Sequence, residues 1–145
     1  MYLGSRGDAE ARRYARFWIR VISTGVLPER WVVLEVPGRR SGRPTRFPLG
    51  MADVDGQWFM VSMLGENCNW VRNVRAARGE VVLRRRRARR CHLDEVPVAD
   101  RAPVLRRYLR KVPGGRPHIP LPPEAGLADL AQIAGRYPVF RVTPR

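Results

Sequence analysis

The sequence has almost no lysine and very little cysteine or histidine. Among its 28 basic residues only Lys111 is a lysine, and the 145 residues include 2 cysteines and 2 histidines. Cys68 and Cys91 have neither a CxxC partner nor clustered histidines, a pattern that argues against a disulfide framework and against a zinc site. We therefore expect two reduced thiols and no metal.

The sequence also lacks a long apolar run. No segment approaches the roughly 20 residues that a membrane span needs, and the opening MYLGSRGDAE lacks the apolar core of a signal peptide. The length and the 44% hydrophobic content suit one globular domain. We predict a single domain over residues 1–145, located in the cytoplasm.

Acidic residues are scarce, and the net charge is +15. Such a charge normally indicates a polyanionic partner. A phosphate-binding surface would, however, tolerate lysine at many positions, so the near-total preference for arginine is more typical of a GC-rich genome. The position of each arginine is therefore more informative than the total.

The first regular pattern is an amphipathic helix from Glu10 to Ile22, within an N-terminal segment of residues 1–25. Its apolar residues recur at helical spacing, with arginines between them. The simpler interpretation is a helix packed on the domain's own core. The alternative is a helix that lies on an anionic membrane surface, at the inner face of the membrane.

Strands and a hairpin follow. RWVVLEVPG is rich in β-formers, and we predict two further strands, Thr45–Asp53 and Trp58–Ser62, joined through the turn pair Asp55-Gly56. Pro48 cannot donate a ladder hydrogen bond, so its strand should be an edge strand or carry a bulge.

NWVRNVRAARG then changes to helical period. We predict a helix over Asn69–Ala77 with Asn69 as N-cap and Gly79 at the C′ position. Trp70 and Asn73, three residues apart, should lie side by side on it.

The stretch VVLRRRRARRCHL holds six arginines in the seven residues Arg84–Arg90. Apolar residues at spacing two flank them, which predicts a β-hairpin with the arginines at its solvent-exposed tip. A nucleic-acid site is the alternative, but no aromatic residues are interleaved for base stacking.

The remaining elements are a helix in DRAPVLRRYLRKV, an irregular loop over 113–126, a helix in LADLAQIAGRY and a strand in PVFRV. Antiparallel neighbours dominate this order. It favours an α+β fold built on a small antiparallel barrel, with an N-terminal helix and flanking helices.

The most informative short motif is GRRSGRP at 38–44. Its glycines permit a sharp turn, and its arginines, the Ser41 hydroxyl and nearby amides can converge on an anion. Leu49, Met63, Leu64 and Trp70 can form a flat apolar slot beside it, with Ser62 and Asn73 as hydrogen-bond partners for ring carbonyls. The alternatives are a solvated basic turn and ordinary core packing.

These residues resemble the deazaflavin-dependent nitroreductases, also called F420-dependent quinone reductases, of actinobacteria. The resemblance runs from Trp31 to Arg84 through GRRSGRPTRFPL, the Asp-Gly hairpin and VSMLGENCNWVRNVRAARGEVVL, with a weaker match at YPVFRV. It implies a split β-barrel similar to the FMN-binding split barrels, spanning 31–145. It also implies a deazaflavin cofactor, coenzyme F420, whose side chain ends in a phosphate and an oligoglutamate tail.

The resemblance places the GRRSG loop near the anionic side chain of the cofactor, and the serine, tryptophan and asparagine near its ring. The cofactor-binding residues predicted in this way are Arg39, Arg40, Ser41, Gly42, Arg46, Pro48, Leu49, Ser62, Met63, Leu64, Gly65, Trp70 and Asn73. Relatives often carry a lysine where Met63 stands, so a phosphate contact should come from Arg46 or Arg72 instead.

The implied function is hydride transfer from reduced F420 to a small electron-poor acceptor such as a quinone, an enone or a nitroaromatic. The cofactor carries this chemistry, so no catalytic triad is needed; Ser62 and His118 are the weak candidates for a catalytic role. Alternatives are an FMN-using split-barrel protein, a non-catalytic carrier of deazaflavin or lipid, and a basic nucleic-acid-binding module. The protein should be a monomer or a homodimer.

Overall fold

The computed structural model describes residues 8–145, with side chains for all of these except 8–11 and 114–116. Residues 1–7, where we expect no signal peptide, lie outside this range. The helices are α1 (Asp8–Ser23), α2 (Asn69–Ala76), α3 (Ala102–Lys111) and α4 (Leu127–Ile133). The strands are β1 (Trp31–Pro37), β2 (Pro44–Gly50), β3 (Ala52–Val54), β4 (Gln57–Val61), β5 (Glu80–Arg84), β6 (Ala88–Glu95) and β7 (Val139–Pro144). Three short 3-10 segments are η1 (Val98–Asp100), η2 (Pro113–His118) and η3 (Ala134–Arg136).

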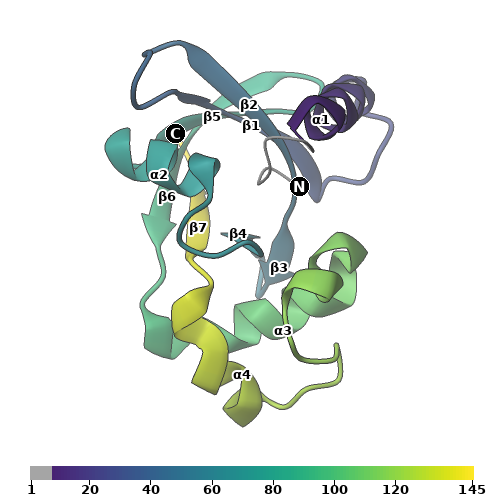
Figure 1. The fold of residues 1–145 in the computed structure, drawn as a ribbon, viewed down its shortest axis with the longest axis vertical. Coiled ribbons are helices and arrows are strands. Elements are labelled where there is room, and N and C mark those ends of the chain that lie inside the picture. The colour runs from purple at the N-terminus through teal and green to yellow at the C-terminus, as the bar shows by residue number, and fades with distance from the viewer. Residues whose placement is uncertain (1–7) are drawn as a thin grey trace.

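All the strands of this part of the chain join one curled antiparallel sheet, in the order β2-β1-β5-β6-β7-β4-β3 (Figure 1). The two edge strands, β2 and β3, are consecutive in the chain and are separated only by Met51. The chain therefore passes directly from one edge of the sheet to the other and curls it into a half-barrel. This architecture confirms the predicted α+β split barrel.

The prediction of one continuous strand over Thr45–Asp53 was wrong, because the chain turns a corner at Met51. A side chain on Gly50 would place its Cβ 2.9 Å from the Trp31 ring and 3.0 Å from Val112, so glycine allows the close approach there. Pro48 lies on β2, an edge strand, as expected from its missing N–H.

Both predicted hairpins are confirmed. Asp55 and Gly56 have φ values of +50° and +78°, the left-handed pair that a two-residue type I′ turn requires. In the second hairpin Arg84 pairs with Ala88, which leaves Arg85–Arg87 as the turn. The arginine run therefore forms the end of a hairpin.

Helix α2 begins and ends differently from our prediction. Cys68, in an extended conformation and without a side-chain cap bond, takes the N-cap position that we had given to Asn69. At the other end Arg78, with φ of +55°, takes the C′ position, and Gly79 donates to the carbonyl of Val74. This is the Schellman arrangement, with glycine one position later than predicted.

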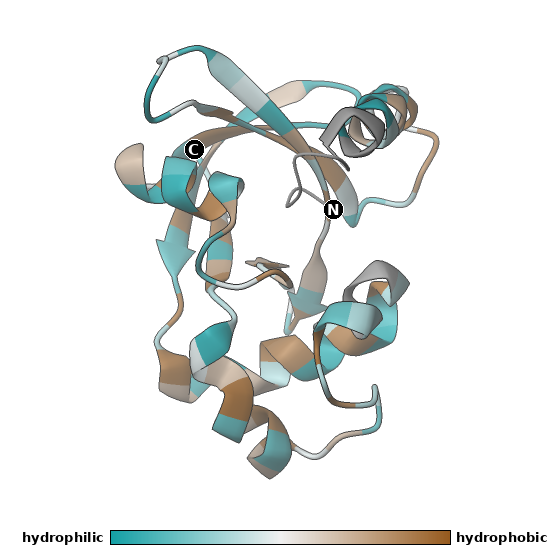
Figure 2. Ribbon diagram, viewed as in Figure 1, coloured by the Kyte–Doolittle hydropathy of each residue, from teal (hydrophilic) through white to brown (hydrophobic). Residues whose placement is uncertain are grey.

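Two hydrophobic cores lie on opposite faces of the sheet. The first fills the barrel and includes Leu34, Met60, Trp70 and Phe140. The second lies between the sheet and the C-terminal helices and includes Leu105 of α3 and Leu130 of α4. Figure 2 shows hydrophobic segments along the strands and on α3 and α4.

Helix α1 packs across β1 and β2, which confirms the simpler of its two interpretations. Ile22 is 1% exposed, whereas Tyr14 and Phe17 remain 54% and 59% exposed. The helix thus covers the sheet with its C-terminal half and leaves aromatic surface open to solvent near its N-terminal half.

Candidate functional site

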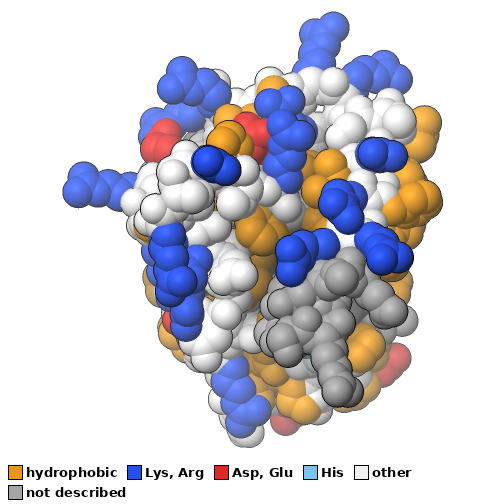
Figure 3. Space-filling model, turned by 45° about the horizontal axis from the view of Figure 1, so that its top comes forward, with side chains coloured by type: hydrophobic (Ala, Val, Ile, Leu, Met, Phe, Trp, Pro, Cys, Tyr) orange, Lys and Arg blue, Asp and Glu red, His pale blue; other side chains and the backbone are white. Residues whose placement is uncertain are grey.

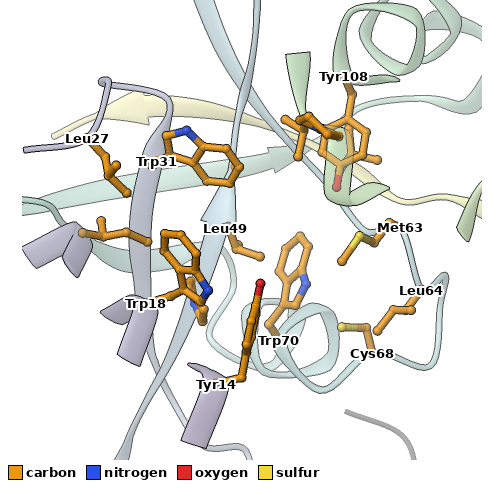
Figure 4. Close-up of a pocket in the computed structure, with 16 residues that line it drawn as sticks. Tyr14, Trp18, Leu27, Trp31, Leu49, Met63, Leu64, Cys68, Trp70 and Tyr108 are labelled. Carbon is orange, nitrogen blue, oxygen red and sulfur yellow. The ribbon is translucent and has the colours of Figure 1, made fainter. Parts of the chain in front are cut away.

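A cavity of about 380 Å³ lies between α1, the first two strands, α2 and α3 (Figure 4). Its size is within the range of about 300–1,000 Å³ usual for ligand sites. None of the side chains that line it in the described part of the chain is charged. The lining residues are Tyr14, Trp18, Ile22, Leu27, Trp31, Pro48, Leu49, Gly50, Val61, Met63, Leu64, Cys68, Trp70, Tyr108, Val112 and Pro113.

Trp70 is the central aromatic wall of the cavity (Figure 4). Its ring is 2% exposed and packs against Phe140 of β7, with centroids 5.6 Å apart. Figure 4 shows Tyr14 from α1 beside it and Leu49 from β2 behind them. The indole is therefore supported from the barrel core and forms part of the aromatic wall of the cavity.

The GRRSGR loop, residues 38–43, is closed by its own backbone and fastened to α2. Gly38 N–H donates to the Arg43 carbonyl and Gly42 N–H to the Gly38 carbonyl, both at 2.8 Å. Gly42 has φ of +72°, a conformation in which glycine is unstrained. The Ser41 hydroxyl accepts from Arg43 N–H at 3.1 Å.

Asn73 ties this loop to α2. Its side chain, in a residue that is 3% exposed, accepts from the backbone N–H of Arg39 at 3.2 Å and from Nη1 of Arg39 at 2.9 Å. Its amide nitrogen lies 3.3 Å from the Thr45 hydroxyl. Arg40 and Arg43 are exposed, and their side chains form no ion pair with the described carboxylates.

Ser62 is fully buried and shapes the turn before α2. Its hydroxyl donates to the Gly65 carbonyl at 2.7 Å. Gly65 has φ of +87°, and a Cβ there would lie 3.3 Å from the Arg136 carbonyl. Ser62 therefore holds the segment that carries Met63 and Leu64 into the cavity wall.

The two arginines expected to replace the missing lysine are both engaged elsewhere. Arg46 Nε pairs with Glu35 at 2.9 Å, and Arg84 Nε pairs with the same carboxylate at 2.8 Å. These bonds, with that of Arg84 the larger cause, hold the pKa of Glu35 below its ordinary value of 4.5. Arg72 donates to the Asn67 side chain at 2.7 Å.

His118 does not line the cavity among the described residues; its backbone carbonyl accepts from the Tyr137 hydroxyl at 3.2 Å. Instead, the cavity contains two tyrosines that we did not predict as site residues, Tyr14 and Tyr108. Tyr108 is 3% exposed, and burial raises the pKa of its hydroxyl. In the sequence Tyr108 has only the spacing of a core residue on α3, so no local signal marks it.

The molecular surface is rich in basic side chains, in keeping with the net charge of +15. The face shown in Figure 3 carries many more basic than acidic side chains, with hydrophobic ones between them. No group of three or more potential metal ligands occurs in the described residues, and no helix among residues 8–145 is long and apolar enough to cross a membrane.

A curled antiparallel half-barrel with an aromatic cavity beside an arginine loop defines a split-barrel protein of the FMN-binding type. The model of the F420H(2)-dependent quinone reductase family matches residues 8–115, and the chain belongs to that family. Its cofactor is therefore coenzyme F420, and the protein is an F420-dependent reductase. No curated protein is significantly similar to it in sequence.

Solved structures share the fold at low sequence identity. A domain-swapped dimer is 19% identical, with a TM-score of 0.57 and coverage of 95% of this chain and 99% of that one. An F420-H2 dependent reductase, FDR-A, is 19% identical, with a TM-score of 0.54 and coverage of 81% and 96%. A NimC/NimA family protein from Clostridium acetobutylicum is 14% identical, with a TM-score of 0.50 and coverage of 92% and 86%.

The residues present suit this cofactor. An uncharged cavity with Trp70 and other aromatic residues in its wall is suited to a flat aromatic ring. The loop that carries Arg39, Arg40 and Arg43 supplies guanidinium donors for phosphate and carboxylate groups.

Proposed function

We propose that the protein transfers a hydride from reduced F420 to a small, flat, electron-poor acceptor such as a quinone, an enone or a nitroaromatic. The observation that carries this proposal is the uncharged, aromatic lining of the cavity. A low-dielectric wall excludes water from the reacting atoms and favours apolar acceptors. Reduced deazaflavin supplies the hydride, and the protein's task is to hold the two rings face to face.

The arginine loop recognises the anionic chain of the cofactor. Arg40 and Arg43 are exposed and can turn towards phosphate or glutamate carboxylates, where charge-assisted hydrogen bonds are about twice as strong as neutral ones. Arg39 has a different role, because Asn73 holds its backbone and one guanidinium nitrogen. Asn73 thus positions the loop, while Trp70, one helical turn earlier, supports the ring.

Tyr108 donates a hydrogen bond to the acceptor. Its hydroxyl belongs to a residue that lines the cavity, and its raised pKa keeps it protonated through the neutral range. A neutral phenol can stabilise negative charge that develops on a carbonyl or nitro oxygen as hydride arrives. Ser62 is less suited to this role because its proton is bonded to the Gly65 carbonyl.

A second proposal concerns the route of an apolar acceptor. Tyr14 lines the cavity and is 54% exposed, and Phe17, three residues on, is 59% exposed. Arg13, Arg16 and Arg20 lie on the same helix. Aromatic side chains flanked by arginines favour an anionic bilayer surface, from which a lipid-soluble quinone would enter beside Tyr14.

The decisive experiment is a fluorescence titration of the purified protein with F420 and with FMN, followed by oxidation of reduced F420 against a panel of acceptors. We expect tighter binding of F420 and turnover with at least one quinone, enone or nitroaromatic. Tighter binding of FMN would identify a flavin user, and binding without turnover a carrier. Binding of neither would refute the proposal.

The membrane proposal has its own measurement. Co-sedimentation with phosphatidylglycerol vesicles should exceed that with phosphatidylcholine vesicles and should fall for Phe17→Ser. Equal sedimentation with the two lipids, or an unaffected variant, would contradict this route.

A further inference from the structure

The arginine run at the hairpin tip borders a second cavity, of about 250 Å³, whose apolar lining belongs largely to the first hydrophobic core. It shares no lining residue with the cavity around Trp70. Its apolar floor consists of Val32, Met51, Trp58, Leu83 and Val142, with Cys91 and Pro144 beside them. Its rim consists of Glu29, Arg84, Arg85, Arg86, Arg87 and Arg89.

The rim arginines divide into two groups. Arg84 is paired with Glu35, and Arg85 donates to the backbone carbonyls of Gly25 and Leu27 in the loop between α1 and β1. These two therefore hold the barrel and the loop together. By contrast, Arg86, Arg87 and Arg89 are exposed and form no ion pair with any described carboxylate.

One buried donor of the rim is also unused. Nε of Arg85 is shielded from solvent and has no hydrogen-bond partner among the described residues. Buried polar groups are almost always bonded, so this donor is available to a water molecule or a ligand once Arg85 turns it towards the cavity. Among the described residues of the lining Glu29 alone is acidic, and the surrounding guanidinium charges outweigh it.

We propose that this cavity is a second ligand site, separate from the cofactor site, for a small amphipathic carboxylate. The arginines bind the carboxylate, and the floor around Trp58 and Met51 receives an aromatic or short aliphatic body. The volume lies below the range of about 300–1,000 Å³ of drug-sized sites, so the body is one or two rings or a short chain.

The shape of the site argues against an extended polyanion as its ligand. The lining, as far as the structure describes the chain, has one aromatic residue, Trp58. Single-stranded nucleic acid is bound instead by successive aromatic platforms along an open groove. A pocket with one cationic end and one apolar end suits a ligand that carries a single negative charge.

The test uses two probes of the same shape, 2-naphthoate and its neutral counterpart 2-naphthamide, titrated calorimetrically into the full chain. We expect 2-naphthoate to bind at one site. The double variant Arg87→Ala/Arg89→Ala should weaken its binding at least about tenfold, the loss expected when charged hydrogen bonds are removed. The affinity for 2-naphthamide should change little. Arg106→Ala/Arg136→Ala, a charge-matched control outside the lining, should leave both affinities unchanged.

The two cysteines show which cavity the probe occupies, because Cys68 lines the cavity around Trp70 and Cys91 lines the second cavity. Alkylation by iodoacetamide, followed for each cysteine by peptide mass spectrometry, should slow at Cys91 when 2-naphthoate is bound and stay unchanged at Cys68. Protection of Cys68 alone would place the probe in the cofactor cavity and overturn the proposal. The proposal would also be overturned if the double variant lost affinity equally for both probes, or if 2-naphthoate showed no saturable binding.

Discussion

Asn73 Oδ1 accepts two hydrogen bonds from one residue, Arg39: one from its backbone N–H at 3.2 Å and one from its guanidinium Nη1 at 2.9 Å. The bond therefore crosses from α2 to the loop after β1, over 34 residues of sequence. It links the helix that carries Trp70 to the loop that carries the free arginines. The two halves of the proposed cofactor site are therefore joined by one buried side chain, that of Asn73.

The first prediction follows from this link. Asn73→Ala leaves the two Arg39 donors without their acceptor, so we expect a loss of about 1–3 kcal/mol in the free energy of unfolding. A loop that is no longer held in place must be ordered on binding, and affinity for F420 should fall about tenfold. Urea denaturation and fluorescence titration measure the two effects.

Asn69→Ala is the matched control for this prediction. Asn69 contacts Arg39 Nη2 only at 3.5 Å and is exposed, so both quantities should stay near their original values. Wild-type affinity in the Asn73 variant would show that the loop is held by its own backbone bonds.

A second prediction separates charge recognition from ring recognition. Arg40→Ala/Arg43→Ala should weaken F420 binding far more than FMN binding, because the F420 tail adds several carboxylates to a phosphate that FMN also has. Trp70→Ala should weaken both ligands, because it removes the wall against which either ring packs. If the arginine substitutions lowered the affinity for F420 and for FMN equally, the loop would not recognise the oligoglutamate tail.

A third prediction concerns Tyr108. Tyr108→Phe keeps the packing but removes the hydroxyl, so kcat should fall about 100-fold while affinity for F420 stays unchanged. Tyr14→Phe, at the half-exposed rim, should change kcat little. Burial raises the pKa of Tyr108 above the ordinary tyrosine value of 10.0, so ionisation of this hydroxyl should not lower the rate below that pH. Full activity in Tyr108→Phe would remove this residue from the mechanism.

The sequence predicted those parts of the fold that short-range chemistry determines. Asp55-Gly56 specifies its own turn, and the arginines of the second hairpin cannot be buried together. The corner at Met51 was missed because it depends on Gly50 lying against Trp31 and Val112, which are distant in sequence. The site shows the same division: motif residues such as Leu49 and Trp70 line the cavity, whereas the roles of Asn73 and Tyr108 depend on contacts that the fold creates.

A fourth prediction is a loss of stability in acid through Glu35, which joins Arg46 of β2 to Arg84 of β5. The lowered pKa of Glu35 means that its contribution is complete above its ordinary value of 4.5 and is lost as the pH falls through the folded-state value. Glu35→Gln should therefore lower the free energy of unfolding by about 1 kcal/mol at neutral pH. The difference from the unmodified protein should shrink as the pH falls below 4.5.

Thermal unfolding at a series of pH values checks this dependence. Glu124→Gln, on an exposed carboxylate without an ion pair to any described side chain, should match the unmodified protein throughout. If the free energy of unfolding of Glu35→Gln differed from that of the unmodified protein by a constant amount down to strongly acid pH, the acid sensitivity could not come from Glu35.

The last prediction is that the arginine hairpin does not recognise nucleic acid specifically. Arg84 pairs with Glu35, and Arg85 donates to backbone carbonyls. The arginines of the run that remain for phosphates are Arg86, Arg87, Arg89 and Arg90. Binding of an oligonucleotide should therefore be weak and independent of sequence, with log affinity falling by about 0.9 per phosphate contact for each tenfold rise in salt. Fluorescence anisotropy over about 50–200 mM salt measures that slope. Replacing Arg86, Arg87, Arg89 and Arg90 by glutamine, which spares the two structural arginines, should weaken the residual binding without abolishing it, because other exposed arginines such as Arg40 and Arg43 remain. Sequence-selective binding that persists at the upper end of this salt range and disappears in that variant would show that the hairpin is a nucleic-acid site after all.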